Sequence, residues 1–248
     1  MKSEHSPQEK TLFSHPFSRA YWRAASGEMA KLRMLLLAAL IIAVRVALKN
    51  VRIPVGDSLY IYIGFIFAAV GGSVYGPVVG FFSGIISDLL GVIIAPVGAF
   101  NPVYTLIEAA AGLLYGVFTY RQKITFGRVL ATKATVNIFI NILCTSVANG
   151  IVVGKGVYYY MIPSILKNLV LLPFEVLVLS VIFLGLIRPM ISLRLYKPEQ
   201  NALKLEKSSY ILLAVVWVLI LIAATLIVLN YPACKEAFKA FFDSIFQK

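Results

Sequence analysis

Long apolar runs alternate with short polar segments along most of this 248-residue chain. An α-helix needs about 20 apolar residues to cross a bilayer, and each run approaches that length. The pattern predicts membrane-spanning helices at approximately 32–49, 59–75, 77–95, 103–120, 130–153, 160–187 and 209–230. We therefore expect an all-α integral membrane protein, with a six-helix bundle followed by a seventh C-terminal transmembrane helix.

The polar segments divide the chain into parts of different character. We expect residues 1–31 to form a polar tail with a short interfacial helix around Phe17 to Trp22, because they contain no continuous apolar core typical of a secretory signal. The expected parts after the tail are the six-helix membrane domain at 32–190, a charged linker at 191–208, the extra helix at 209–230 and an amphipathic tail at 231–248.

Charge sets the predicted orientation. Hydrophobic residues make up 60% of the chain and charged residues 14%, against about 25% charged in soluble domains. The net charge of +12 comes from basic clusters at the ends of the runs, which is the positive-inside pattern rather than a nucleic-acid surface. The clusters are Arg19, Arg23, Lys31 and Arg33; Arg121, Lys123, Arg128 and Lys133; and Arg188, Arg194, Lys197, Lys204 and Lys207. The N-terminus and the charged linker are therefore predicted to be cytoplasmic, with the loops at 50–58, 96–102 and 154–159 and the C-terminal tail outside.

Small residues recur at helical spacing in two of the predicted helices. Ala39, Ala43 and Ala47 form one stripe along the first helix, and Gly80 and Gly84 repeat the spacing in the third. Small side chains let helices approach closely in lipid. The glycines predict a close helix contact. The alanine stripe fits two interpretations equally, which are packing within the bundle and docking of another membrane subunit.

Ionisable residues inside the predicted helices are costly, and each is a candidate for function or for buried pairing. Arg45, Asp88 and Glu108 lie toward the outer ends of their helices, and Lys167 and Glu175 lie on one helix. We expect Lys167 and Glu175 to fix helix packing, and Arg45 and Asp88 to serve a cavity. The helices contain no histidine, and the chain has no Walker loop or nucleophile elbow. The sequence indicates no catalytic residue, no metal site and no cofactor.

The outer loops suggest a ligand cavity. Two prolines and one glycine interrupt APVGAFNPVY, and irregular backbone at membrane depth is tolerated where it lines a cavity. Cations, amides and aromatic rings near these loops suit a planar, anionic, hydrogen-bonding solute. The predicted substrate-binding residues are Arg52, Tyr62, Asp88, Asn101, Tyr104, Asn149 and Lys155.

The stretches GPVVGFFSGIISDLLG and PVGAFNPVYTLIEAAAGLLYGVF resemble the S components of energy-coupling factor (ECF) vitamin transporters, and are most similar to the folate-specific group. The resemblance covers roughly residues 32–190 and is most specific at 76–118. It implies a non-enzymatic vitamin-binding subunit of a prokaryotic plasma membrane, with an outward-facing pocket for folate or a related vitamin. It also implies that Ala39, Ala43 and Ala47 pack against a transmembrane coupling subunit, which joins two cytoplasmic ATPases.

Two positions depart from the folate-specific pattern. Ser164 stands where that group has an Arg three residues before the Lys of the last helix, and Thr145 to Ala148 replace an Asn-Thr-Leu-Trp stretch. The alternative substrates are pantothenate and a pyrimidine or pyridine vitamin. Two other classes also stay open, which are a membrane-embedded enzyme using Asp88 and Glu108 and a structural membrane adaptor.

Overall fold

The computed structural model describes residues 12–49, 52–56, 59–94, 100–154 and 156–204, and short stretches between 207 and 222. For residues 52–56 and 59–61 it describes the backbone alone. The helices are α1 (Arg19–Gly27), η1 (Glu28–Ala30), α2 (Leu32–Leu48), α3 (Phe65–Ile94), α4 (Pro102–Thr119), α5 (Phe126–Thr135), the π-helix η2 (Val136–Cys144), α6 (Thr145–Val153), α7 (Val157–Ser192) and η3 (Pro198–Gln200). The strands are β1 (Arg52–Gly56) and β2 (Leu59–Tyr62).

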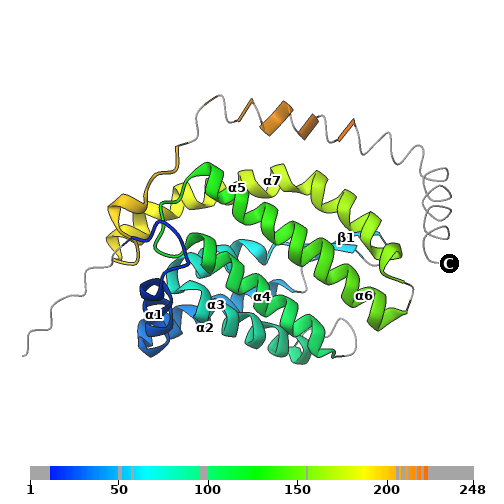
Figure 1. Ribbon diagram of the computed structural model, residues 1–248, viewed down its shortest axis with the longest axis horizontal. Helices are drawn as coiled ribbons and strands as arrows, with labels where there is room; N and C mark the ends of the chain where they lie inside the picture. The colour runs from blue at the N-terminus through cyan, green and yellow to red at the C-terminus, as the bar shows by residue number, and fades with distance from the viewer. Residues whose placement is uncertain are drawn as a thin grey trace, which may run out of the picture.

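The membrane bundle consists of long apolar helices, shown side by side in Figure 1. Within the described residues, four helical segments are long and apolar enough to cross a bilayer: Phe65–Ile94, Pro102–Thr119, Phe126–Val153 and Val157–Ser192. Helix α2 has 17 residues and so spans about 26 Å, which is close to the thickness of the hydrocarbon core. The expected all-α membrane fold is confirmed.

Helix α3 is two helices joined at a sharp turn. Gly76 has φ 83° and ψ −179°, and Pro77 follows it. Glycine adopts this positive φ at little cost, and proline suits the first turn of the helix that begins there. The turn confirms the predicted boundary between the second and third helices. The six expected helices are thus α2, the two halves of α3, α4, the continuous segment from α5 to α6, and α7.

The start of the second predicted helix is wrong. Residues 59–62 form β2, which pairs antiparallel with β1, with Arg52 opposite Tyr62 and Ile53 opposite Ile61. The helix itself begins only at Phe65. Pro54 and Gly56 disfavour a continuous helix here. Backbone polar groups at membrane depth must be hydrogen-bonded within the protein, and a hairpin satisfies part of this need itself.

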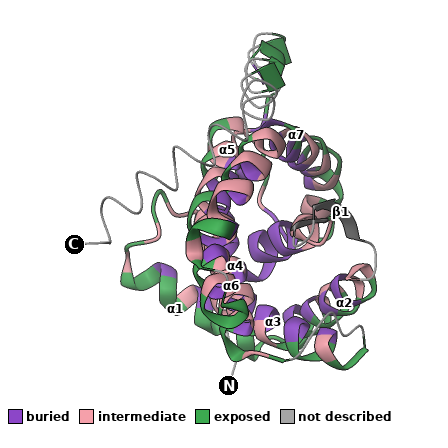
Figure 2. Ribbon diagram, turned by 90° about the vertical axis from the view of Figure 1, so that its right-hand side faces the viewer, coloured by how far each residue is buried: buried purple, intermediate pink, exposed green. Residues whose placement is uncertain are grey.

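Glycines bring α3 and α4 into close contact. A Cβ added to Gly80 would lie 2.5 Å from the carbonyl oxygen of Gly112, and one added to Gly72 would lie 2.8 Å from the backbone nitrogen of Gly116. No side chain fits between the two helices at these points. The close helix contact predicted at Gly80 and Gly84 is confirmed, and Figure 2 shows the buried residues turned toward the interior of the bundle.

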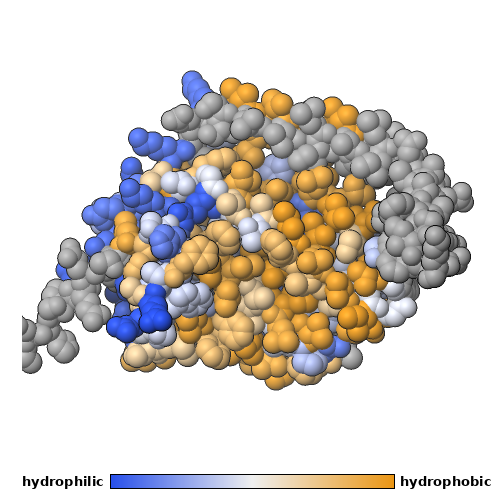
Figure 3. All heavy atoms as spheres, in the orientation of Figure 1, coloured by the Kyte–Doolittle hydropathy of each residue, from blue (hydrophilic) through white to orange (hydrophobic). Residues whose placement is uncertain are grey.

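One end of the molecule is polar. Hydrophilic residues gather in Figure 3 at the end that carries α1, while apolar residues cover most of the remaining described surface in that view. The segment after α7 folds against this end, since Leu195, Tyr196 and Leu203 are buried. The hydroxyls of Tyr196 and Ser73 share a hydrogen bond, and Gln200 O accepts one from Ile124 N at 3.0 Å. We call this the basic end, and the opposite end the hairpin end.

The terminal segments are described only in part. The interfacial helix expected around Phe17 to Trp22 corresponds to α1, whose cap Ser18 accepts a hydrogen bond from Tyr21 N at 3.2 Å. The seventh helix expected at 209–230 lies largely outside the described residues, and the tail at 231–248 lies wholly outside them. Trp217 Nε1 donates to Val170 O at 3.0 Å, so the described part of that segment contacts α7.

Candidate functional site

Two ion pairs connect α2 to its neighbours near the hairpin end. Arg45 Nη2 lies 2.6 Å from Glu108 Oε2 on α4, and Lys49 Nζ lies 2.8 Å from Asp88 Oδ1 on α3. Arg45 and Lys49 are four residues apart and so share one face of α2. That face is held against both α3 and α4 by charge.

Asp88 is committed to contacts within the protein. It is buried, Lys49 occupies Oδ1, and Thr105 donates a hydrogen bond to Oδ2 at 2.8 Å. A direct contact between Asp88 and a ligand would compete with these two partners. The arrangement instead places Asp88 where it orients Lys49 and the first turn of α4.

The carboxylates of Asp88 and Glu108 also fail to form an acid dyad. Such a dyad depends on two carboxyl groups that share a proton. Here each carboxylate has its own cation on α2, namely Lys49 for Asp88 and Arg45 for Glu108. The geometry therefore gives no support to the membrane-embedded enzyme.

Tyr104 and Asn149 come together from α4 and α6. The Tyr104 hydroxyl donates to Asn149 Oδ1 at 2.6 Å, and both side chains are partly exposed. Asn101 lies just before α4 and caps it, with Oδ1 accepting from Val103 N at 3.0 Å. Three of the predicted residues thus lie near the hairpin end, where Tyr104 and Asn149 are bonded to each other and Asn101 caps α4.

A second buried ion pair joins α5 to α7. Glu175 Oε1 lies 3.0 Å from Lys133 Nζ, and Glu175 Oε2 accepts from Asn137 Nδ2 at 2.8 Å. Lys133 is 1% exposed and lies 4.1 Å from the centroid of the Phe65 ring. Grouping Lys133 with Arg121, Lys123 and Arg128 at the end of an apolar run was wrong, because its charge pairs with a carboxylate inside the bundle. Glu175 has the expected packing role, with Lys133 as an ion-pair partner. Lys167, the other residue expected to fix helix packing, is half-buried.

Amides and a hydroxyl extend this polar cluster toward the hairpin end. Ser164 Oγ donates to Asn141 O at 2.9 Å, and Asn168 Nδ2 donates to Ser164 O at 2.8 Å. Asn141 Nδ2 in turn donates to Asn137 Oδ1 at 2.9 Å. Asn137 and Asn141 lie on η2, and π-helical turns occur frequently at functional sites.

The sequence contained a signal for some of these missed residues. Asn137 and Asn141 are one turn apart in an otherwise apolar run, which marks a polar stripe inside the membrane. Thr105 and Lys49 carried no such signal, because their roles depend on which helix faces them. Ser164 is the position where the folate-specific pattern has an Arg, and it is buried within this cluster.

The remaining predicted contacts are placed only in part. Arg52 lies in β1 opposite Tyr62, which is 41% exposed, and the Arg52 side chain is outside the described set. Lys155 and the segment 95–99 also lie outside the described residues. The Arg52–Tyr62 pairing puts these two residues side by side on the hairpin.

The alanine stripe lines an apolar groove between α2 and α3. Ala39, Ala43 and Ala47 are all exposed, and the groove has a volume of about 580 Å³. Its other lining residues include Phe82 and Ile86, and Ser83 is the one polar residue in the lining. An apolar groove of this kind suits a helix better than an anionic solute. The exposure of the alanines favours docking over packing within the bundle.

Comparisons with known proteins agree with this architecture. Residues 29–197 match the family model described as the S component of the ECF-type riboflavin transporter. The folate transporter FolT of Clostridium novyi (strain NT) is 31% identical over 116 residues, which are 47% of this chain and 67% of that protein. A crystal structure of FolT bound with folic acid has a TM-score of 0.57 and 25% identity, and the match covers 62% of this chain and 93% of that one. The resemblance carried by the motifs at 76–118 is confirmed.

Proposed function

Because this chain belongs to the S component family of ECF-type transporters, we propose that it binds folate at its hairpin end and delivers it through an ATPase-driven coupling module. The observation that carries the choice of vitamin is the likeness to FolT in both sequence and fold. The family is one of transport subunits, so binding and transfer, rather than turnover, are the activities to measure.

The residues predicted at the hairpin end suit the chemistry of folate. Folate combines a planar pterin ring with a glutamate tail that carries two carboxylates. Tyr62 and Tyr104 supply aromatic faces, and Asn149 supplies an amide for the ring edge. In this proposal Arg52 and Lys155 bind the carboxylates, as charge-assisted hydrogen bonds to such groups are strong. Asn101 and Asp88 act by positioning α4 and Lys49.

Riboflavin is the competing ligand, because the matched family model carries its name. Riboflavin is also planar, but it has no carboxylate. The two vitamins therefore differ in their need for the cations of the hairpin end. Replacing Lys155 and Arg52 with Gln should weaken folate binding strongly and leave riboflavin binding nearly unchanged.

The first experiment is to identify small molecules released from the purified protein by mass spectrometry, and then to titrate folate and riboflavin by calorimetry. Stoichiometric folate binding supports the proposal. Riboflavin binding with no response to folate would keep the transport function and reassign the vitamin. Failure to bind either of them, or pantothenate, would refute the vitamin-binding function and favour a structural adaptor.

The apolar groove is the proposed docking face for the coupling subunit. Ala43→Phe would fill the groove from its middle without touching the bundle interior, since Ala43 is exposed. We expect loss of complex formation and of ATP-dependent uptake, with ligand binding retained. Val181→Phe is the matched control, because Val181 is an exposed apolar residue on α7, a helix that does not line the groove. Equal uptake by the two variants would exclude docking at this groove.

The orientation in a prokaryotic plasma membrane follows from charge. In this proposal the basic end and the N-terminus are cytoplasmic, which satisfies the positive-inside rule. Cysteines at the exposed positions Ser26 and Val153, in a background without Cys144 and Cys234, test it. An impermeant maleimide added to whole cells should label Val153→Cys and spare Ser26→Cys; the opposite result would invert the topology.

A further inference from the structure

Helix α1 is fixed to the basic end of the bundle by a buried tyrosine. Tyr21 is 0% exposed, and its hydroxyl donates to Gly116 O at 3.0 Å. Its ring packs edge to face against Tyr120, with the ring centroids 5.8 Å apart. The position of α1 relative to the membrane helices is therefore set by the fold.

Chain length places α1 at the membrane surface. Helix α1 ends at Gly27 and the spanning helix α2 begins at Leu32, so only residues 28–31 separate them. Four residues reach at most about 14 Å even when fully extended. Since Leu32 is 72% exposed and opens an apolar helix, α1 lies at the level of the lipid headgroups.

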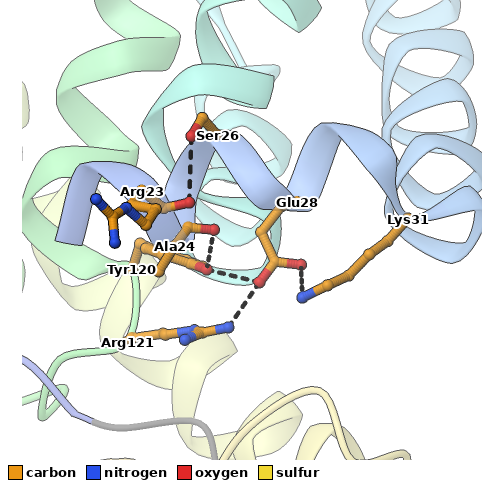
Figure 4. A network of polar contacts seen from close by, with 7 residues as sticks. All are labelled: Arg23, Ala24, Ser26, Glu28, Lys31, Tyr120 and Arg121. Atoms are coloured by element: carbon orange, nitrogen blue, oxygen red, sulfur yellow. Dashed lines mark hydrogen bonds and ion pairs between the residues drawn. The ribbon is translucent and has the colours of Figure 1, made fainter. Parts of the chain in front are cut away.

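The exposed charged residues of α1 and of residues 28–31 are all positive. Arg19 and Arg23 are exposed and lie one turn apart on α1. The nearby carboxylate of Glu28 is 1% exposed and already holds Tyr120, Arg121 and Lys31. Figure 4 shows these contacts, with the Arg23 guanidinium pointing away from them. Glu28 therefore does not neutralise the two outward arginines.

Apolar side chains stand exposed beside these cations. Phe17 is 89% exposed and Trp22 is 40% exposed, and both lie within or next to α1. A helix with exposed aromatic residues and arginines is typical of segments that lie in the membrane interface and attract anionic lipids.

We propose that α1 forms a binding site for anionic phospholipid headgroups, in which Arg19 and Arg23 contact the phosphate region and Trp22 sits among the headgroups. The occupant is a membrane lipid because the site lies at headgroup depth and combines exposed aromatic rings with two arginines that form no ion pair among the described residues. This site is separate from the vitamin site at the hairpin end, and its test does not depend on the vitamin.

The test uses the full chain with Trp217→Phe, which leaves Trp22 as the sole tryptophan. The protein is reconstituted in vesicles of phosphatidylcholine and phosphatidylglycerol, with bromine placed on one lipid or on the other. We expect brominated phosphatidylglycerol to reach half-quenching of Trp22 fluorescence at a mole fraction several-fold below that of brominated phosphatidylcholine. Each arginine near an anionic surface accounts for about fivefold enrichment. The preference should fall with added salt, which screens exposed charges.

The variant Arg19→Gln/Arg23→Gln should remove most of the preference while phosphatidylcholine still quenches Trp22. The matched control is Arg188→Gln/Lys204→Gln, which removes the same charge from exposed positions at the same end and should retain the preference. Equal quenching by the two lipids before any charge is removed would overturn the proposal. So would a preference that survives the first variant or disappears equally in the control. If neither lipid quenches Trp22, the proposal is also overturned, and this face would be assigned to a protein partner.

Discussion

Replacing Asp88 separates a positioning role from direct contact with the ligand. Its Oδ1 lies 2.8 Å from Lys49 Nζ, and its Oδ2 accepts from Thr105 at 2.8 Å. Asp88→Asn keeps the shape of the side chain and an oxygen acceptor for Thr105, but it removes the anion opposite Lys49. The substitution therefore isolates the ion pair.

The expected loss of stability follows from the burial of the pair. Removing one partner of a buried ion pair costs about 3 to 5 kcal/mol. The side chains of Lys49 and Asp88 are 21% and 10% exposed, so water partly solvates the remaining charge. We expect Asp88→Asn and Lys49→Met each to lower the unfolding free energy by about 2 to 3 kcal/mol. The double variant removes both charges and should cost at least about 1 kcal/mol less than the sum.

Unfolding in detergent is measured for the unmodified protein, the two single variants and the double variant, which together form a double-mutant cycle. A folate titration of each protein gives its affinity. If Asp88 acts by positioning Lys49 and α4, Asp88→Asn should weaken folate binding, and the double variant should recover part of the affinity together with the stability. A coupling energy below about 0.5 kcal/mol would refute the pair as a unit. Stability that recovers while affinity stays lost would instead show that one of these two side chains contacts the ligand.

Three further predictions follow from the same contacts. Glu28→Gln should lower the melting temperature at pH 7 and flatten its dependence on acid pH. Burial raises the pKa of Glu28, but hydrogen bonds from its tyrosine and lysine partners and two positive charges together lower it by more, so the net pKa is below its usual value. The carboxylate stabilises fully above the usual pKa of Glu, and this stabilisation is lost as the pH falls through the lowered pKa. Gly80→Leu should prevent folding, seen as aggregation in size-exclusion chromatography, while Gly127→Leu, where nothing lies within 4 Å of an added Cβ, should fold normally. Tyr104→Phe removes the hydrogen bond to Asn149 and should weaken folate binding about fivefold by calorimetry, with an unchanged melting temperature.

The helices and their closest contact were predictable because local rules decide them. The bilayer fixes the length and composition of each span, and Gly76 with Pro77 marks the one sharp turn between two helices with no loop. Gly80 likewise predicted a neighbour at backbone distance, since no other residue leaves that space. The hairpin was missed because the short run of Leu59–Tyr62 is as apolar as a helix, and its strand character depends on pairing with β1.

Partners in the candidate site were harder to predict because they depend on how helices are rotated and registered against one another. The sequence placed Asp88 and Glu108 inside the predicted helices, where an ionised group is costly without a partner, but it did not say which cation each would take. The structure gives Lys49 to Asp88 and Arg45 to Glu108. No spacing within a single helix encodes that choice, since it depends on how α2 is rotated against α3 and on which of its side chains reaches α4.

Helix α2 shows how one such choice bears on the alternative that the alanine stripe left open. Successive residues of a helix are about 100° apart, so Arg45 points about 200° away from both Ala43 and Ala47. Arg45 is buried because its charge requires Glu108, and that requirement turns the two alanines toward the outside. One face of α2 is therefore bound to its own bundle, and the opposite face is exposed and apolar, which is what the proposed docking of another helix requires.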